Sequence, residues 1–448
     1  MHKALFMLLS ATALSVFLAV GALAQAPDLT GEAMVTAPGG DVWMITDHNR
    51  TTRRTFSDGG RIALSCDKKA YGLYLIWDAP APTSWTLTAD GQALLQPAKG
   101  YRFLHEYVPL PDGARALSLS WEGPATLCDL VLLGEGELPD FVQNWRLPEG
   151  KADLLLLPTH ADDEHLYYGG IMPRYADDGH IEIQVAYMVN HNGEAYRPHE
   201  LLNGLWEVGI RRYPVIPDFP DVYADSLEQA KTIYDEAKIV SYQSNLLRQF
   251  MPQVVVGHDR NGEYGHGAHQ LNTYALLQAV EQAAHEKIWD TPKLYLHLAM
   301  ENPIVLDYNV PLPAFAGKTA FEMAVAGFAK HTSQQKFFKV EQEGPYDCRK
   351  FGLVRSTVGL DQMKNDLFEH LTPYSEQVPV TEPKSQQASE TEIVPSTESE
   401  PVSSTAESMV QPTQGPEDEF AMVIAFAIGL GLMYFLPPAL RHRKRPGR

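Results

Sequence analysis

Residues that can hold a metal ion and activate water stand in two groups along this chain. They are His160, Asp162, Asp163 and Glu164 in the first group, and His266 and His269 in the second. A catalytic zinc ion is held by three protein ligands drawn from imidazole nitrogens and carboxylate oxygens, and its fourth position stays open for water. A neighbouring carboxylate that is not a ligand can then take a proton from that water. The sequence therefore predicts a hydrolytic metal site.

The elements around these groups would have to bring them together. Apolar strand candidates alternate with helical stretches: the strands at residues 152–157, 181–189, 253–257 and 293–299, and the helices at 227–250 and 270–286. This alternation predicts an α/β domain with a largely parallel sheet and helices on both faces. Ligands of such sheets bind outside the carboxyl ends of the strands. His160 follows the first strand and His269 follows the third, so we expect the two groups to converge.

Three further residues next to these groups have a structural interpretation. Glu164 and His165 are expected to begin the helix after the first group, since the helix dipole favours an acidic residue in the first turn. His258, which also follows the third strand, either adds a polar wall to the site or caps its strand.

Two motifs resemble those of the LmbE-like, or PIG-L, family of zinc-dependent N-acetylglucosaminyl de-N-acetylases. Thr159-His160-Ala161-Asp162-Asp163-Glu164 is similar to the family's Ala-His-Pro-Asp-Asp-Glu, and Gly265-His266-Gly267-Ala268-His269 is similar to its Gly-His-Pro-Asp-His. Arg197-Pro-His-Glu200 and His331-Thr-Ser-Gln334 extend the resemblance, which covers roughly residues 150–335. It implies a Rossmann-like fold.

The resemblance also implies a role for each site residue. The metal ligands would be His160, Asp163 and His269, and the general base would be Asp162. His266 would stabilise the oxyanion or protonate the leaving amine. Tyr264 and Arg197 would bind the substrate. The chain departs from the family at three positions. Proline is missing at Ala161 and Gly267, which is expected to loosen both turns, and Ala268 replaces an aspartate beside the catalytic histidine.

These observations predict zinc-dependent hydrolysis of the acetamide of an N-acetylated sugar, an N-acetylglucosamine-type conjugate, by metal-bound water with Asp162 as the general base. The identity of the metal is left open between Zn²⁺ and another divalent ion such as iron or cobalt, because imidazole and carboxylate ligands suit several divalent ions. The alternative is a non-catalytic cell-surface glycan-binding or adhesion protein that retains the deacetylase fold. Ala268 favours this alternative and the retained Asp162 opposes it. The sequence has no basic patch that would indicate a nucleic-acid partner.

Residues 27–148 predict an all-β sandwich domain ahead of the deacetylase-like domain at 149–374. Its strand candidates, separated by Pro, Gly and Asp, are residues 71–77, 84–88, 116–121 and 127–133. We expect this domain to grip a carbohydrate. In an oxidising exterior Cys66 and Cys128 could pair, a question that the sequence leaves open, and Cys348 would be structural.

The two ends of the chain indicate export and anchoring. Residues 1–26 have the pattern of a signal peptide. Residues 375–419, rich in Ser, Thr, Pro and Glu, predict a disordered stalk that carries much of the net charge of −20. Residues 420–440 predict a transmembrane helix and residues 441–448 a basic cytoplasmic tail. The expected location is the cell membrane, single-pass, with the N-terminal and catalytic domains extracellular.

Overall fold

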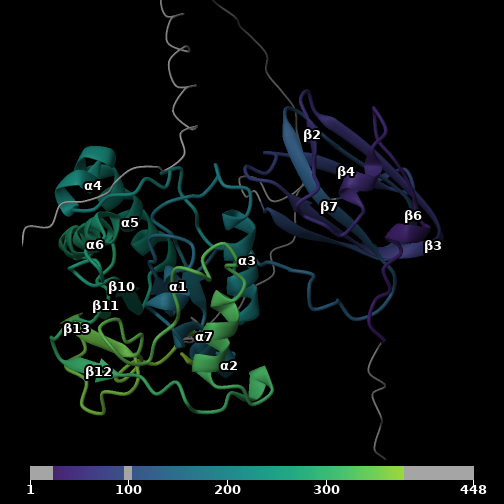
Figure 1. The fold of residues 1–448 in the computed structure, drawn as a ribbon. Coiled ribbons are helices and arrows are strands. Elements are labelled where there is room, and N and C mark those ends of the chain that lie inside the picture. The colour runs from purple at the N-terminus through teal and green to yellow at the C-terminus, as the bar shows by residue number, and fades with distance from the viewer. Residues whose placement is uncertain (1–23, 95–102, 378–448) are drawn as a thin grey trace, which may run out of the picture. The chain divides into compact units, whose positions relative to one another are not determined.

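The structure is a computed structural model that describes residues 24–94 and 103–377 (Figure 1). These residues form two hydrogen-bonded sheets, which belong to the same compact unit. The first sheet holds the N-terminal region, and the second lies among helices. The proposed chemistry depends on the second sheet.

The N-terminal region is a seven-stranded antiparallel sheet in the order β2-β7-β3-β6-β4-β5, with β1 paired to β3. Its strands are β1 (Met34–Thr36), β2 (Arg54–Phe56), β3 (Gly60–Trp77), β4 (Trp85–Ala89), β5 (Gln92–Leu94), β6 (His105–Trp121) and β7 (Ala125–Leu133), with short 3-10 helices at Thr30–Glu32 and Val42–Ile45. The region is all-β, as expected, and its strands are joined in one hydrogen-bonded network. The reason is that β3 and β6 pair with each other along most of their length, through two register shifts.

The second sheet is mixed, in the order β12-β13-β11-β10-β8-β9. Its strands are β8 (Leu154–Leu156), β9 (Ile183–Val185), β10 (Val254–Gly257), β11 (Lys293–His297), β12 (Pro303–Val305) and β13 (Lys350–Ser356). The four strands from β9 to β11 pair in parallel, and β13 and β12 add an antiparallel edge that the sequence analysis missed.

Helices cover both faces of this sheet. They are α1 (Asp163–Leu166), α2 (Ile171–Asp178), α3 (Arg197–Glu207), α4 (Leu227–Ile233), α5 (Glu236–Phe250), α6 (Gly267–His285) and α7 (Ala320–Phe328), with 3-10 helices at Pro313–Phe315 and Tyr374–Glu376. In β8, Leu154 and Leu156 pack into the core shared with α2, α3 and α7, whereas Leu155 packs into the core shared with α5 and α6. A strand covered on both faces needs apolar residues at every position, which explains the uninterrupted apolar run.

The helix expected at 227–250 is two helices. Asp235 lies between α4 and α5, and its side chain accepts hydrogen bonds from the backbone N–H groups of Ala237 and Lys238. This N-cap satisfies donors that a continuous helix would have bonded to the preceding turn. The periodicity of the apolar residues did not reveal the break.

The expected localisation is corrected by the structure. Across the parts of the chain that the structure describes, no helix combines the length and the apolarity needed to cross a bilayer, and the single-pass membrane location is not retained. The segments on which that prediction rested lie outside the described residues. They are the signal at 1–26 (except residues 24–26), the stalk from residue 378 onward, the span at 420–440 and the tail at 441–448. Cys66, Cys128 and Cys348 are buried free thiols, so the first two are not paired.

Candidate metal centre

The loop after β8 carries the first group of predicted ligands into α1. Asp162 precedes the helix in a left-handed conformation (φ 116°), which is uncommon for a residue other than glycine. Oδ2 of Asp163 accepts a hydrogen bond from the backbone N–H of His160 at 2.7 Å. The loop is therefore fixed by its own side chains, and the two consecutive aspartates face different partners.

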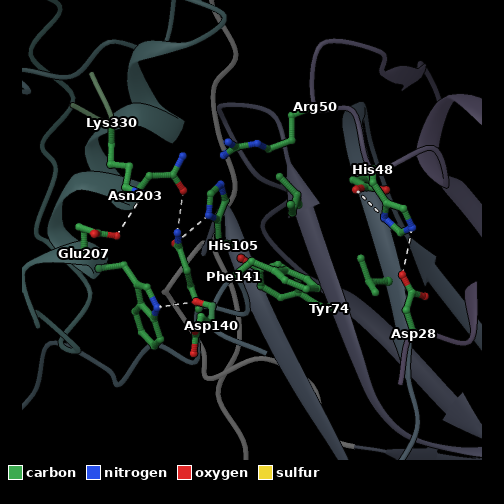
Figure 2. A pocket seen from close by; sticks show the side chains of 15 residues that line it. Asp28, His48, Arg50, Tyr74, His105, Asp140, Phe141, Asn203, Glu207 and Lys330 are labelled. Atoms are coloured by element: carbon green, nitrogen blue, oxygen red, sulfur yellow. Dashed lines mark hydrogen bonds and ion pairs between the residues drawn. The ribbon is translucent and has the colours of Figure 1, made fainter. Parts of the chain in front are cut away.

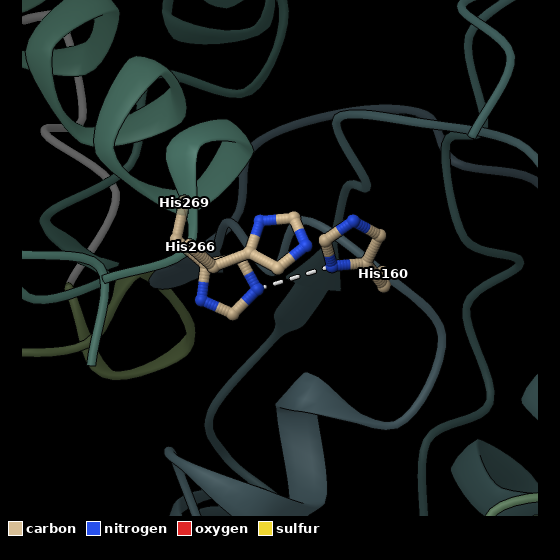
Figure 3. Close-up of side chains that lie close together, drawn as sticks. All are labelled: His160, His266 and His269. Carbon is tan, nitrogen blue, oxygen red and sulfur yellow. Dashed lines mark hydrogen bonds between the residues drawn. The ribbon is translucent and has the colours of Figure 1, made fainter. Parts of the chain in front are cut away.

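Three donor atoms from two distant parts of the chain form a nearly equilateral triangle. His160 Nδ1 lies 3.1 Å from His269 Nε2, and Asp163 Oδ2 lies 3.2 Å from each of these nitrogens (Figure 3 shows the two histidines beside His266). Ligands about 2.0–2.1 Å from a tetrahedral zinc ion are separated by roughly 3.3 Å, so the triangle fits such an ion. All three side chains are buried.

The charge state of Asp163 suits a ligand. Burial alone would raise its pKa, but the neighbouring His269, His160 and His258 outweigh burial and hold the pKa of Asp163 well below its usual range. A metal-binding carboxylate must be deprotonated. Asp163 therefore offers an anionic oxygen at the same point as the two imidazoles.

Glu263 is an outer partner that the sequence analysis did not single out. Its carboxylate lies 2.7 Å from His269 Nδ1, 3.1 Å from His258 Nδ1 and 3.1 Å from His297 Nδ1, and all four side chains are buried. A carboxylate on the far nitrogen of a ligating histidine fixes the tautomer and orientation of the ring. The only sequence signal was its place in the Gly-Glu-Tyr-Gly-His motif. His258 is thus a buried partner of Glu263, and it also accepts a hydrogen bond from the backbone N–H of Thr159.

Asp221 is a second missed residue. Its Oδ1 lies 3.4 Å from His160 Nε2, and its Oδ2 lies 3.4 Å from His191 Nδ1. The sequence analysis gave it no role in the site. No periodicity or motif could have linked a turn residue to the loop after β8.

His266 stands next to the triangle and caps α6. Its ring centroid is 4.6 Å from that of His269 and 4.7 Å from that of His160, and the three side chains could themselves hold an ion. Its Nδ1 accepts a hydrogen bond from the backbone N–H of Ala268 at 3.2 Å. Burial lowers the pKa of His266 to about 3. The ring is therefore neutral, with its proton on Nε2.

Asp162 lies outside the triangle and is paired with Arg197. Arg197 Nη1 donates to Asp162 Oδ2 at 3.2 Å, and both side chains are buried. Burial raises the pKa of Asp162 well above its usual range, although Arg197 opposes this shift. The structure thus brings Arg197 to the predicted general base, not to an open surface.

Tyr264 lies at the open side of the centre. Its ring centroid is 5.6 Å from that of His266, and 43% of the residue is exposed. A pocket next to it is lined by further aromatic rings, including Tyr167, Phe338 and Tyr346. A substrate approaching from this side would meet Tyr264 first.

The two turns that lack proline are held by hydrogen bonds of backbone N–H groups. The backbone N–H of Ala161 donates to His191 Nε2 at 3.1 Å, and that of Gly267 donates to the carbonyl of Ala224 at 2.8 Å. Proline has no N–H and could make neither bond. A side-chain carbon at Gly267 would also lie 2.0 Å from the carbonyl oxygen of Ser226. Both turns are held by hydrogen bonds instead of by proline rings.

A separate pocket of about 500 Å³ lies away from this centre (Figure 2). It is lined by Tyr74 and His105 of the first sheet, by Phe141, and by Asn203 and Trp206 of α3. Phe141 is 55% exposed, and its ring lies 6.3 Å from that of Tyr74. Exposed aromatic rings beside polar side chains are typical of ligand pockets.

Comparisons with known proteins give sugar deacetylases among the relatives of this chain. No family model matches the chain. The chain is 28% identical over 188 residues to the 1D-myo-inositol 2-acetamido-2-deoxy-alpha-D-glucopyranoside deacetylase of Kribbella flavida, covering 32% of this chain and 60% of the relative. A similar deacetylase of Catenulispora acidiphila is 26% identical over 212 residues, covering 40% of this chain and 65% of the relative. The chain thus spans less than two thirds of the length of these curated relatives.

Among solved structures, the chain resembles the N,N'-diacetylchitobiose deacetylase from Pyrococcus horikoshii. The two are 16% identical with a TM-score of 0.31, covering 41% of this chain and 71% of that one. In sequence, the chain is thus similar to deacetylases of a 2-acetamido sugar conjugate.

Proposed function

We propose that the chain is a metal-dependent deacetylase that hydrolyses the acetamide of an N-acetylated sugar of the N-acetylglucosamine type. The observation that carries this proposal is the triangle of His160 Nδ1, Asp163 Oδ2 and His269 Nε2, with an unligated carboxylate next to it. The likeness to sugar deacetylases supports the choice of substrate class. The α/β domain at 149–374, Rossmann-like in this proposal, would carry the reaction.

His160, Asp163 and His269 would hold the ion, and Zn²⁺ suits two imidazoles and a carboxylate. When bound, a zinc ion acts as a Lewis acid that lowers the pKa of a water toward ~7 and polarises a carbonyl. Iron and cobalt fit the same donors. The outer carboxylates of Glu263 and Asp221 would orient the two histidine rings.

Asp162 would move the proton. As the water oxygen bonds to the acetyl carbon, an Asp162 carboxylate oxygen takes one proton from that water. The carbon–nitrogen bond then breaks, the water oxygen leaves in acetate, and the proton held by Asp162 passes to the departing sugar nitrogen. A carboxyl group whose pKa is raised by burial gives up this proton less readily to solvent, and Arg197 keeps it oriented.

His266 would stabilise the charge that develops on the carbonyl oxygen. Its Nδ1 already accepts from Ala268, so the proton on Nε2 is the one available to donate. Of the two roles considered for this residue, the tautomer favours oxyanion stabilisation over protonation of the amine. One such donor is worth about 3 kcal/mol in the barrier. Tyr264 would contact the substrate at the mouth of the centre.

The second candidate function is a glycan-binding protein that keeps the fold without turnover. The pocket with the exposed ring of Phe141 favours it, because aromatic faces pack against sugar rings, and so does Ala268 in place of an aspartate. The expected carbohydrate grip of the N-terminal domain would use the same pocket. Asp162 argues against this candidate, since a binding protein needs no free carboxylate beside a metal.

Acetate release separates the two candidates. The purified chain, loaded with Zn²⁺, is incubated with a panel of N-acetylglucosamine conjugates, and Asp162→Asn serves as the matched variant. We expect acetate from the parent chain and a loss of 10²-fold or more in Asp162→Asn, with unchanged metal content. Binding without acetate would favour the glycan-binding candidate, and equal release by both chains would remove Asp162 as the base.

A further inference from the structure

A second cluster of metal-binding side chains lies inside the α/β region, next to the first. Glu164 and His165 belong to α1, and His331 follows the end of α7. All three side chains are fully buried. Sequence analysis expected Glu164 and His165 only to start a helix.

Most of the polar atoms of this cluster have no hydrogen-bond partner among the described residues. These atoms are Glu164 Oε1 and both ring nitrogens of His165 and His331. A buried polar group without a partner costs free energy of roughly 1–3 kcal/mol, and native proteins rarely leave several together. Such a concentration calls for a group that satisfies them at once.

The distances in the cluster fit a ligand shell better than a set of hydrogen bonds. Glu164 Oε1 lies 3.4 Å from His165 Nε2 and 3.4 Å from His331 Nε2. An N–H···O hydrogen bond is normally about 2.7–3.2 Å long. Two ligands of a tetrahedral zinc ion are roughly 3.3 Å apart, which also matches the first centre.

The backbone of α3 passes close to both histidine rings. A side-chain carbon at Gly204 of α3 would lie 2.7 Å from Nε2 of both His165 and His331 and 3.2 Å from the carbonyl oxygen of Gly327. Glycine at this position therefore lets α3 approach both rings, and a methyl group there would push against the two nitrogens. The buried hydroxyl of Tyr187 lies beside Glu164 and can donate a hydrogen bond to its carboxylate.

We propose that Glu164, His165 and His331 form a second, enclosed site for a divalent transition metal such as Zn²⁺. Because the side chains are shut off from solvent, the ion is structural and enters as the chain folds. It ties α1 to the segment that follows α7. The inference stands whether or not the chain is a deacetylase.

This site would also hold the first centre in place. Glu164 Oε2 accepts a hydrogen bond from the backbone N–H of Asp162 at 2.9 Å. Asp163, the next residue, belongs to the first triangle. Three consecutive residues therefore connect the two centres, and the second ion would support the left-handed backbone at Asp162.

Metal content tests the proposal. The purified full chain, dialysed against metal-free buffer, is measured by inductively coupled plasma mass spectrometry together with His269→Ala, His331→Gln and the exposed control His180→Gln. We expect two ions per chain in the parent and in His180→Gln, and one in each of the other variants. A parent with one ion that His269→Ala removes and His331→Gln keeps would overturn the second site.

A further variant guards against a folding defect in His331→Gln. Gly204→Ala keeps all three donors but presses a methyl group against both histidine nitrogens, and Gly193→Ala, which meets no atom within 4 Å, is its control. We expect Gly204→Ala to lose one ion and Gly193→Ala to lose none. In His269→Ala, which keeps only the second site, cobalt supplied while the chain is made and folds should give visible absorption bands, and their absence would count against the site. Acetate release is read separately, so a failed deacetylase assay leaves these ion counts interpretable.

Discussion

Arg197 Nη1 lies 3.2 Å from Oδ2 of Asp162, and both side chains are buried. Family resemblance had suggested that Arg197 contacts the substrate. Its position makes it a partner of the proposed base. A buried carboxylate loses its hydration, and a guanidinium at hydrogen-bond distance favours the charged form and fixes its direction.

Replacing Arg197 by Met should therefore act through Asp162. We expect kcat to fall on the order of 10- to 100-fold while metal content stays the same. In an Asp162→Asn background the same change should lower kcat little further, because the carboxylate that Arg197 pairs with is already gone. Steady-state kinetics of the four chains measures this coupling. Additive losses would mean that Arg197 acts elsewhere, for instance on the substrate.

Glu263→Gln should weaken metal binding without removing a ligand. The carboxylate faces three imidazoles, and an amide would turn donor hydrogens toward some of them. Loss of such an outer partner typically lowers metal affinity about 10- to 100-fold. A competition titration with a chromophoric chelator measures the affinity, and Glu281→Gln on the exposed face of α6 is the control. Unchanged affinity would separate Glu263 from the metal centre.

Gly267→Ala should destabilise the protein. The added carbon would meet the Ser226 carbonyl oxygen at 2.0 Å, so the start of α6 or the residues before α4 must move. We expect the free energy of unfolding to fall by roughly 1–3 kcal/mol. Gly31→Ala, where no atom lies within 4 Å, should change it little. Denaturant melts of both variants check the difference, and equal curves would contradict the close approach.

The N-terminal sheet should contribute a pH dependence through Glu106. Burial raises the pKa of Glu106 to about 7, although its hydrogen bond from Trp85 Nε1 opposes the shift. Because the folded pKa lies above the unfolded one, folding stability is fully present below pH ~4.5 and is lost as pH rises through about 7. The loss is on the order of 1–3 kcal/mol.

Glu106→Gln keeps the acceptor for Trp85 and cannot ionise. Its free energy of unfolding should fall less than that of the parent between pH 4 and 8, on the order of the 1–3 kcal/mol that ionisation costs. Urea melts across this range measure both chains. Parallel pH profiles would show that Glu106 ionises without penalty.

Sequence reasoning reached the α/β character and the meeting of two loops because both follow from local rules. Apolar runs mark β8 and β10, and parallel neighbours end at the same edge of a sheet, where His160 and His269 lie 3.1 Å apart. It missed Glu263 and Asp221 as partners, because their contacts join residues that no periodicity connects. It also missed the antiparallel edge of β12 and β13, whose pairing depends on tertiary contacts. The cluster around His331 escaped for the same reason.

The backbone N–H groups of Ala161 and Gly267 bear on how such proteins can be recognised from sequence. In this chain the two loops keep their shape through donors that an imino acid lacks, so the identity of the residue after each first histidine can vary while the ion-holding atoms stay in place. A search pattern that insists on a ring at those positions would pass over chains built in this way. A pattern written on the donor atoms, with small residues allowed between them, would find them.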